Sequence, residues 1–240
     1  MPLPKINTPT YEMTLPSTGK KIKYRPFLVR EEKILILAME SENMKDITNS
    51  IIQILSDCIL TENVKIESLA TFDIEYLFLN VRARSVGETV DVNITCPDDG
   101  ETQVEMSIDI DSIKIQKTRG HKNTIKLDDE LSMKLRYPSL DQFVENNFET
   151  GEVVSEVGQS LAMISSCIEM IYNQEESWEA SEYSRKELDE FLEQMNTKQF
   201  KQIEKFFTTM PKLSHKIAVK NPETGVESEV VLEGLASFFS

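Results

Sequence analysis

Residues 90–110 read VDVNITCPDDGETQVEMSIDI, and this stretch decides the fold class of the chain. Apolar and polar residues alternate on both sides of Cys96-Pro97-Asp98-Asp99-Gly100. A period of two residues is typical of a β-strand with one buried face, and a short run of Pro, Asp and Gly is typical of a turn. The stretch therefore predicts a β-hairpin.

The same pattern predicts two more hairpins and an extended N-terminus. One hairpin covers residues 124–135 around Asp128-Asp129, and the other covers residues 214–232 around Asn221-Pro222-Glu223-Thr224-Gly225. Residues 1–28 contain Pro and short alternating pieces on either side of a turn, so they predict an extended arm or a hairpin.

Helical spacing of apolar residues dominates the rest of the chain. The expected helices cover about residues 31–38, 44–59, 71–84, 139–148, 155–172, 184–195 and 197–210. Residues 72–79 and the two cysteines Cys58 and Cys167 are expected in the core, whereas Trp178 is expected in a polar loop over residues 173–181.

These elements predict an α+β fold, in which helices pack with several antiparallel β-hairpins. The chain divides by pattern into an N-terminal arm or hairpin (1–28), an α+β core with hairpins (29–138), an acidic helical segment (139–211) and a C-terminal hairpin with a short apolar tail (212–240).

The charge excludes two classes of partner. The chain has 41 Asp and Glu against 26 Lys and Arg, which gives a net charge of −15. A phosphate backbone or an anionic lipid surface attracts basic proteins, so we expect neither a nucleic-acid nor a membrane partner. No apolar run approaches the roughly 18 to 20 residues that span a bilayer.

The charge is also unevenly distributed along the chain. Residues 139–196 carry −12, whereas residues 1–37 carry +4. Such asymmetry favours docking of oppositely charged surfaces, either on a partner or head to tail between copies of this chain. The candidate contact residues are the basic ones of the arm and the apolar ones of the tail: Lys20, Lys21, Lys23, Arg25, Leu235, Phe238 and Phe239. The alternative for the basic residues is an ordinary solvated surface.

Residue types that carry catalysis or bind metals are sparse. The turns at residues 96–100 and 221–225 share the pattern x-Pro-acid-x-Gly. A zinc knuckle needs thiolates in such turns, but only Cys96 occupies one of these positions, so no metal is expected. His121 and His215 lack a neighbouring nucleophile or metal-binding pattern, and no phosphate-binding glycine motif is present. We therefore expect no enzyme and no cofactor; an enzyme with an acidic cleft stays as a weaker alternative. Three widely spaced cysteines fit a reducing compartment.

Several stretches, taken in order, match the pattern of one family. They are residues 1–9 (MPLPKINTP), 15–27 (LPSTGKKIKYRPF), 72–88 (FDIEYLFLNVRARSVGE) and 221–239. In these the chain resembles the T4-like bacteriophage baseplate proteins, in particular those that act in assembly of the baseplate hub. Members of the wider family often carry cysteine knuckles where this chain has its two Pro-Gly turns.

The resemblance implies a non-enzymatic role in building the phage tail. It implies a place close to the hub and tape-measure proteins in the cytoplasm of the infected host. One hypothesis is a chaperone-like assembly factor that binds hub or tape-measure proteins and is then released. A permanent structural subunit of the virion baseplate is the alternative.

Overall fold

The computed structural model describes residues 6–41, 43–140 and 156–234, which fall into two compact units. Unit 1 consists of Met1–Ile66, Phe72–Gln116 and Lys212–Ser240, and unit 2 of Glu67–Thr71 and Lys117–Pro211. Each unit has a hydrophobic core cluster of its own. Among the described residues, no helix combines the length and the hydropathy needed to cross a membrane.

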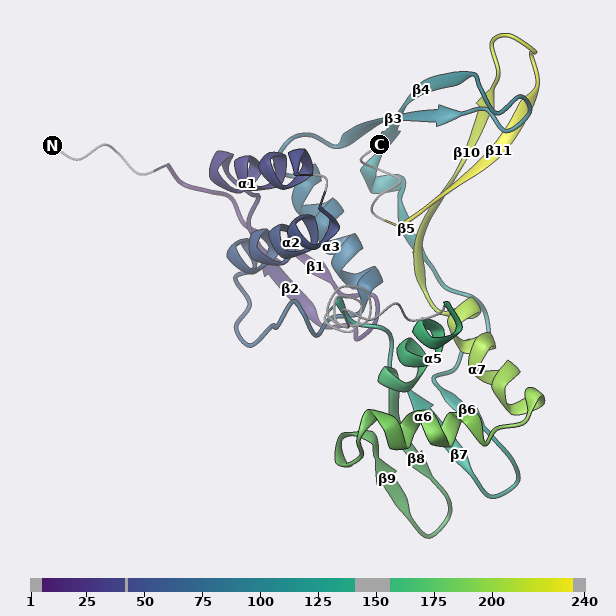
Figure 1. Ribbon diagram of the computed structural model, residues 1–240. Helices are drawn as coiled ribbons and strands as arrows, with labels where there is room; N and C mark the ends of the chain where they lie inside the picture. Colours follow the sequence, from purple (N-terminus) through teal and green to yellow (C-terminus); the bar gives the residue numbers. More distant parts are fainter. Residues whose placement is uncertain (1–5, 42, 141–155, 235–240) are drawn as a thin grey trace, which may run out of the picture. The chain divides into compact units, whose positions relative to one another are not determined.

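Unit 1 begins with a hairpin followed by helices (Figure 1). Strands β1 (Tyr11–Thr14) and β2 (Lys21–Tyr24) pair antiparallel, and α1 (Val29–Glu40), α2 (Met44–Cys58) and α3 (Thr71–Ala83) follow. The described part of residues 1–28 is thus a hairpin, and Ile22 on β2 is fully buried. Burial of an aliphatic side chain of this size contributes about 1.5–3 kcal/mol, so the hairpin is part of the core.

A buried carboxylate joins this hairpin to α3. Asp73 is fully buried and accepts hydrogen bonds from the backbone N–H of Ser17, at 3.0 Å, and from the Ser17 hydroxyl. Most of the aromatic stretch in α3 is buried as predicted, including Phe72, Leu77 and Phe78.

The other part of unit 1 consists of β-structure. Strands β3 (Thr89–Thr95) and β4 (Gln103–Asp109) form the predicted hairpin, in which Val92 pairs with Met106. A turn of 3₁₀-helix, η1 (Ile110–Ser112), leads to β5 (Lys114–Gln116). Strands β10 (Lys212–Lys220) and β11 (Glu227–Glu233) form the predicted C-terminal hairpin and join β5 in a sheet of order β11-β10-β5.

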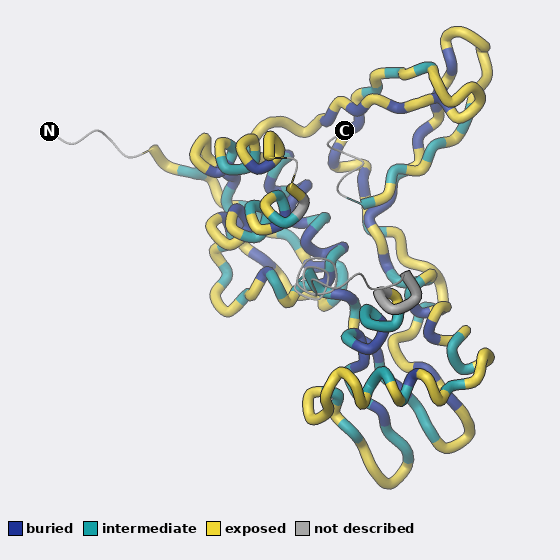
Figure 2. The backbone as a smooth tube through the Cα atoms, viewed as in Figure 1, coloured by how far each residue is buried: buried dark blue, intermediate teal, exposed yellow. Residues whose placement is uncertain are grey.

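Unit 2 packs helices against a four-stranded sheet of order β6-β7-β8-β9. The strands are β6 (Thr124–Lys126), β7 (Ser132–Leu135), β8 (Ile168–Tyr172) and β9 (Ser177–Glu179). The helical elements are α5 (Glu156–Ser166), η3 (Ala180–Glu182), α6 (Arg185–Glu193) and α7 (Thr197–Thr209). The turns between β6 and β7 and between β8 and β9 are exposed (Figure 2).

The prediction of one helix over residues 155–172 is wrong in its last third. The helix α5 ends at Ser166, and β8 begins at Ile168. Ile164, Ile168 and Ile171 fit a helical spacing, but β8 gains backbone pairing on both sides, from β7 and from β9. Residues 177–179, expected in a loop, form the edge strand β9, because they pair with β8. The segment 139–211 is therefore not purely helical.

The fold class is α+β, as the sequence predicts, and its strands lie in small antiparallel sheets. Cys58 and Cys167 are fully buried free thiols, also as predicted. Burial raises the pKa of each of these two thiols to about 11, so neither is a ready nucleophile at neutral pH.

Candidate protein-binding site

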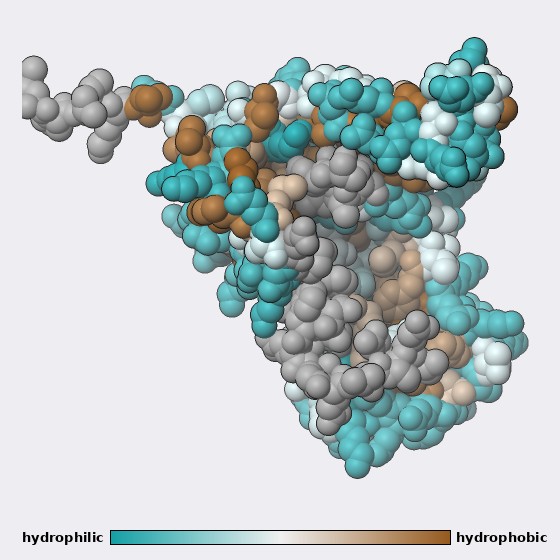
Figure 3. All heavy atoms as spheres, turned by 45° about the horizontal axis from the view of Figure 1, so that its top comes forward, coloured by the Kyte–Doolittle hydropathy of each residue, from teal (hydrophilic) through white to brown (hydrophobic). Residues whose placement is uncertain are grey.

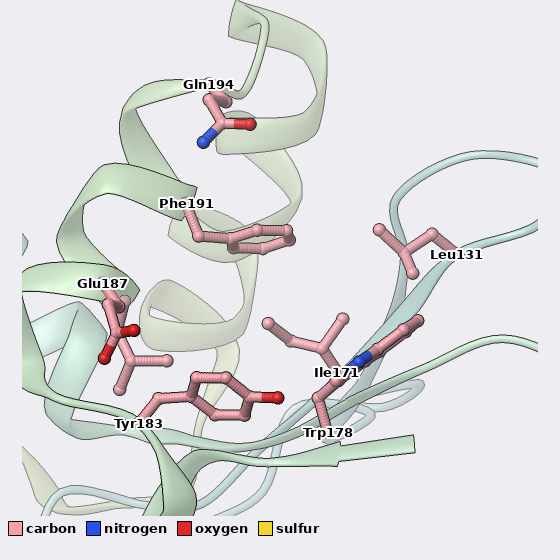
Figure 4. A pocket seen from close by; sticks show the side chains of 8 residues that line it. Leu131, Ile171, Trp178, Tyr183, Glu187, Phe191 and Gln194 are labelled. Atoms are coloured by element: carbon pink, nitrogen blue, oxygen red, sulfur yellow. The ribbon is translucent and has the colours of Figure 1, made fainter. Parts of the chain in front are cut away.

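A hollow of about 400 Å³ in unit 2 is lined mostly by aromatic and aliphatic side chains. Its lining residues are Leu131, Ile171, Trp178, Tyr183, Glu187, Leu188, Phe191 and Gln194, and we call it the aromatic groove. Figure 4 shows Tyr183, Phe191 and Ile171 pointing into the same space. An apolar hollow with a few polar groups has the composition of a binding site.

Local capping fixes one wall of the groove. The hydroxyl of Ser184 accepts a hydrogen bond from the backbone N–H of Glu187 at 3.4 Å, and Oε2 of Glu187 accepts one from the backbone N–H of Ser184 at 2.8 Å. This capping box sets where α6 begins, and therefore places Tyr183 just before the helix and Phe191 two turns into it. The hydrogen bond from the Ser184 hydroxyl also lowers the pKa of Glu187, which keeps it ionised.

The sheet supplies the floor of the groove. Ile171 on β8 stands directly opposite Trp178 on β9. Ile171 is buried, and Trp178 is half-buried against the core cluster of unit 2, whereas Tyr183 is 39% exposed. The groove thus joins a largely buried apolar floor to an exposed aromatic rim, an arrangement that favours binding of a protein partner.

The segments that supply most of the groove carry charges of predominantly one sign. Residues 177–193, which form β9, η3 and α6, carry six acidic side chains against Arg185 and Lys186. Glu175 and Glu176 add two more in the exposed turn before β9. An apolar groove with an acidic surround is complementary to a segment that has apolar anchors and basic flanks.

Three of the predicted basic contact residues are exposed in unit 1. Lys20, Lys21 and Lys23 are exposed, and Lys21 and Lys23 share the face of β2 opposite to the buried Ile22 and Tyr24. This polar face is available for an electrostatic contact.

Arg25, the fourth, faces inward. Its side chain is 12% exposed, and its Nη2 lies 2.9 Å from Oε1 of the fully buried Glu31. Arg30 also donates to Glu31 at 2.5 Å, as does the backbone N–H of Leu28 at 2.7 Å. Burial opposes the charge of Glu31, but the hydrogen bonds from Arg25 and Arg30 outweigh it and lower its pKa to about 2.

The predicted contacts in the tail, Leu235, Phe238 and Phe239, lie outside the described residues. A different apolar surface is present on α1, where an apolar stripe is predicted. Ala38 is buried, but Val29, Ile36 and Leu37 are 80%, 51% and 55% exposed. Figure 3 shows apolar side chains gathered over this helical part of unit 1.

Sequence reasoning did not find the aromatic groove. Its lining comes from three separate segments, around Leu131, around Ile171 and over residues 178–194. The one available signal was that the single tryptophan of the chain lies five residues before Tyr183, in a stretch otherwise rich in acids. Within the described residues, no group of three or more His, Cys, Asp or Glu side chains is placed to hold a metal ion.

The chain thus has an α+β fold in which the aromatic groove and the exposed lysines are candidate contact surfaces. The family model described as "T4 bacteriophage base plate protein" matches residues 8–240, which is nearly the whole chain, so the chain belongs to that family. Comparison with curated proteins and with solved structures gave no match.

Proposed function

We propose that this chain is a non-enzymatic assembly protein of the central baseplate hub, which binds hub or tape-measure proteins in the host cytoplasm and acts like a chaperone. The observation that carries this proposal is the family match over residues 8–240, because a baseplate protein acts through contacts with other baseplate components. No cofactor is part of the proposal.

We place the partner contact in the aromatic groove. The partner segment we expect is amphipathic, with an aliphatic or aromatic anchor for the space between Tyr183, Phe191 and Trp178, and with Lys or Arg on its flanks. The support is charge complementarity with the acidic residues of 177–193. The exposed lysines of β2 provide a second contact, to an acidic partner surface or to another copy of this chain.

Quantitative mass spectrometry of purified virions tests the release of the protein after assembly. An assembly protein that leaves is present at far less than one copy per symmetry-related position of the baseplate. A fixed, stoichiometric amount would instead establish the alternative, a permanent structural subunit.

A further inference from the structure

The tips of the two long hairpins in unit 1 have the same local backbone. In the turn between β3 and β4, the N–H of Gly100 donates to the carbonyl of Cys96 at 2.9 Å. In the turn between β10 and β11, the N–H of Gly225 donates to the carbonyl of Asn221 at 2.9 Å. The φ angles of the two glycines are +71° and +74°, in the left-handed region that glycine adopts without strain.

This shared turn has the sequence plan of a zinc knuckle. In a pair of Cys-Pro-x-Cys-Gly knuckles, the first and fourth residues of both turns supply four thiolates to one tetrahedral ion. The corresponding positions here hold Cys96, Asp99, Asn221 and Thr224. One thiol, one carboxylate, one amide and one hydroxyl do not fit a structural zinc site.

Hydrogen bonds connect the two tips instead. Nδ2 of Asn221 donates to Oδ2 of Asp99 at 2.8 Å and lies 3.1 Å from both carboxylate oxygens of Asp98. The hydroxyl of Thr224 donates to Oδ2 of Asp98 at 2.5 Å. These four residues come from two turns that lie more than 120 residues apart in the chain, Asp98 and Asp99 from one turn and Asn221 and Thr224 from the other. We call this set of four the clasp.

The polar groups of the clasp are satisfied internally, and its amide is buried, although Asp98, Asp99 and Thr224 are exposed. Oδ1 of Asn221 accepts from the backbone N–H of Glu223 at 2.8 Å, so both ends of the amide are engaged. Asp99 accepts from the backbone N–H groups of Glu101 and Thr102 at 3.0 and 3.1 Å. Asn221 and Cys96 are each 1% exposed. A buried amide with all of its hydrogen bonds made fixes one arrangement of its neighbours.

We infer that the clasp holds the two hairpin tips together in the place of a metal ion, and that positions 96, 99, 221 and 224 keep the arrangement of a tetrahedral thiolate site. This inference is independent of the proposed function. It means that the chain keeps its paired hairpins without metal, and that three substitutions are enough to create a metal site.

The direct test is the triple variant Asp99→Cys, Asn221→Cys and Thr224→Cys, titrated with Co²⁺ under reducing conditions. We expect one Co²⁺ per chain, with the visible absorption bands of a tetrahedral thiolate complex and release of thiol protons on binding. The matched control is Glu101→Cys, Glu105→Cys and Glu223→Cys, at exposed positions of the same hairpins, for which no such bands are expected. A folded triple variant without stoichiometric tetrahedral Co²⁺ would overturn the inference.

If the triple variant does not fold, a second variant tests whether the clasp holds the two hairpin tips together. Asn221→Leu removes the amide that crosses between the tips and leaves Asp98 and Asp99 without their shared donor. We expect labelling of Cys96 by a thiol reagent to become at least tenfold faster than in the wild-type chain, while Cys58 and Cys167 stay protected. Equal labelling rates of Cys96 in the two proteins would overturn the inference that the clasp holds the two hairpin tips together.

Discussion

Nη2 of Arg25 lies 2.9 Å from Oε1 of Glu31, whose carboxylate is fully buried in unit 1. The pair connects the end of the N-terminal hairpin to the first turn of α1. Arg25 is one of the four basic residues that were expected to contact a partner, but it stabilises the fold of unit 1 instead. The remaining three, Lys20, Lys21 and Lys23, are exposed.

Glu31→Gln should destabilise unit 1 by about 3 kcal/mol, since it leaves the guanidinium of Arg25 without its counter-charge in a mostly buried place. Chemical unfolding followed by circular dichroism measures this. Glu40→Gln, at an exposed position of the same helix, should cost less than about 0.5 kcal/mol. Equal stability of the two variants would contradict a structural role for the pair.

The pH dependence of this pair has a definite sign. The pKa of Glu31 is lowered to about 2 in the folded protein, so the carboxylate contributes stability above its unfolded pKa of about 4.3. That contribution should be lost as the pH falls from about 4.3 towards 2. Wild-type protein should therefore lose more stability over this range than Glu31→Gln does.

The clasp should also open in acid. Hydrogen bonds from the Thr224 hydroxyl and the Asn221 amide lower the pKa of Asp98, and those from Thr102 and the backbone of Glu101 lower that of Asp99. Groups with a depressed folded pKa stabilise the fold above an unfolded pKa of about 3.9, and this contribution is lost progressively as the pH falls from there through the folded pKa.

We expect Cys96 to react faster with a dipyridyl disulfide at pH 3 than at pH 6. Cys58 and Cys167 in the same sample report whether the rest of the fold stays closed. If all three thiols keep the same relative rates at both pH values, the clasp does not respond to acid.

His121 gives unit 2 a different pH dependence. Its ring stacks on Tyr137 and lies 5.1 Å from the ring of Phe206, and its Nδ1 lies 3.0 Å from the hydroxyl of Thr209. Burial lowers the pKa of His121, so the neutral form is favoured and its contribution to stability is lost as the pH falls below about 6.5.

His121→Phe should remove this loss, because a phenyl ring keeps the stacking without titrating. Trp178, the single tryptophan, lies in unit 2 and reports its unfolding by fluorescence. We expect the stability of unit 2 in the variant to be nearly constant between pH 7 and about pH 5.5. His215→Gln, in unit 1, should leave the wild-type pH dependence of the Trp178 signal in place. If the stability of unit 2 also became independent of pH in His215→Gln, the assignment to His121 would be contradicted.

Reversing three lysines tests the electrostatic contact proposed for β2. Lys20→Glu, Lys21→Glu and Lys23→Glu together should leave folding intact, because the three side chains are exposed. Analytical ultracentrifugation with the hub proteins present should show weaker association at low salt and a smaller difference at high salt. Unchanged sedimentation would exclude a role for this face.

The sequence was most informative where one local period extends over a whole element. The alternation over residues 90–110 predicted β3 and β4, and the helical spacing of apolar residues over 184–195 predicted α6. It misled at Ile168–Tyr172, where a helical spacing of isoleucines is outweighed by pairing with strands on both sides. Such pairing depends on segments far apart in the chain, which a local pattern does not contain.

The same limit applies to the sites. The likeness of the turns at residues 96–100 and 221–225 is visible in the sequence, but their hydrogen bonds across 122 or more residues are not. The aromatic groove is likewise formed by side chains from separate segments, so composition shows only its acidic surround.

Co-expression with the hub and tape-measure proteins, followed by pull-down, tests most directly whether unit 2 binds a baseplate partner through the aromatic groove. Tyr183→Asp places a charge on the 39% exposed rim, and Leu60→Asp places the same charge on a 45% exposed position of unit 1. We expect the wild-type chain and Leu60→Asp to retain a hub or tape-measure protein, and Tyr183→Asp to retain at least tenfold less. Equal retention by Tyr183→Asp and Leu60→Asp would rule out binding through the groove.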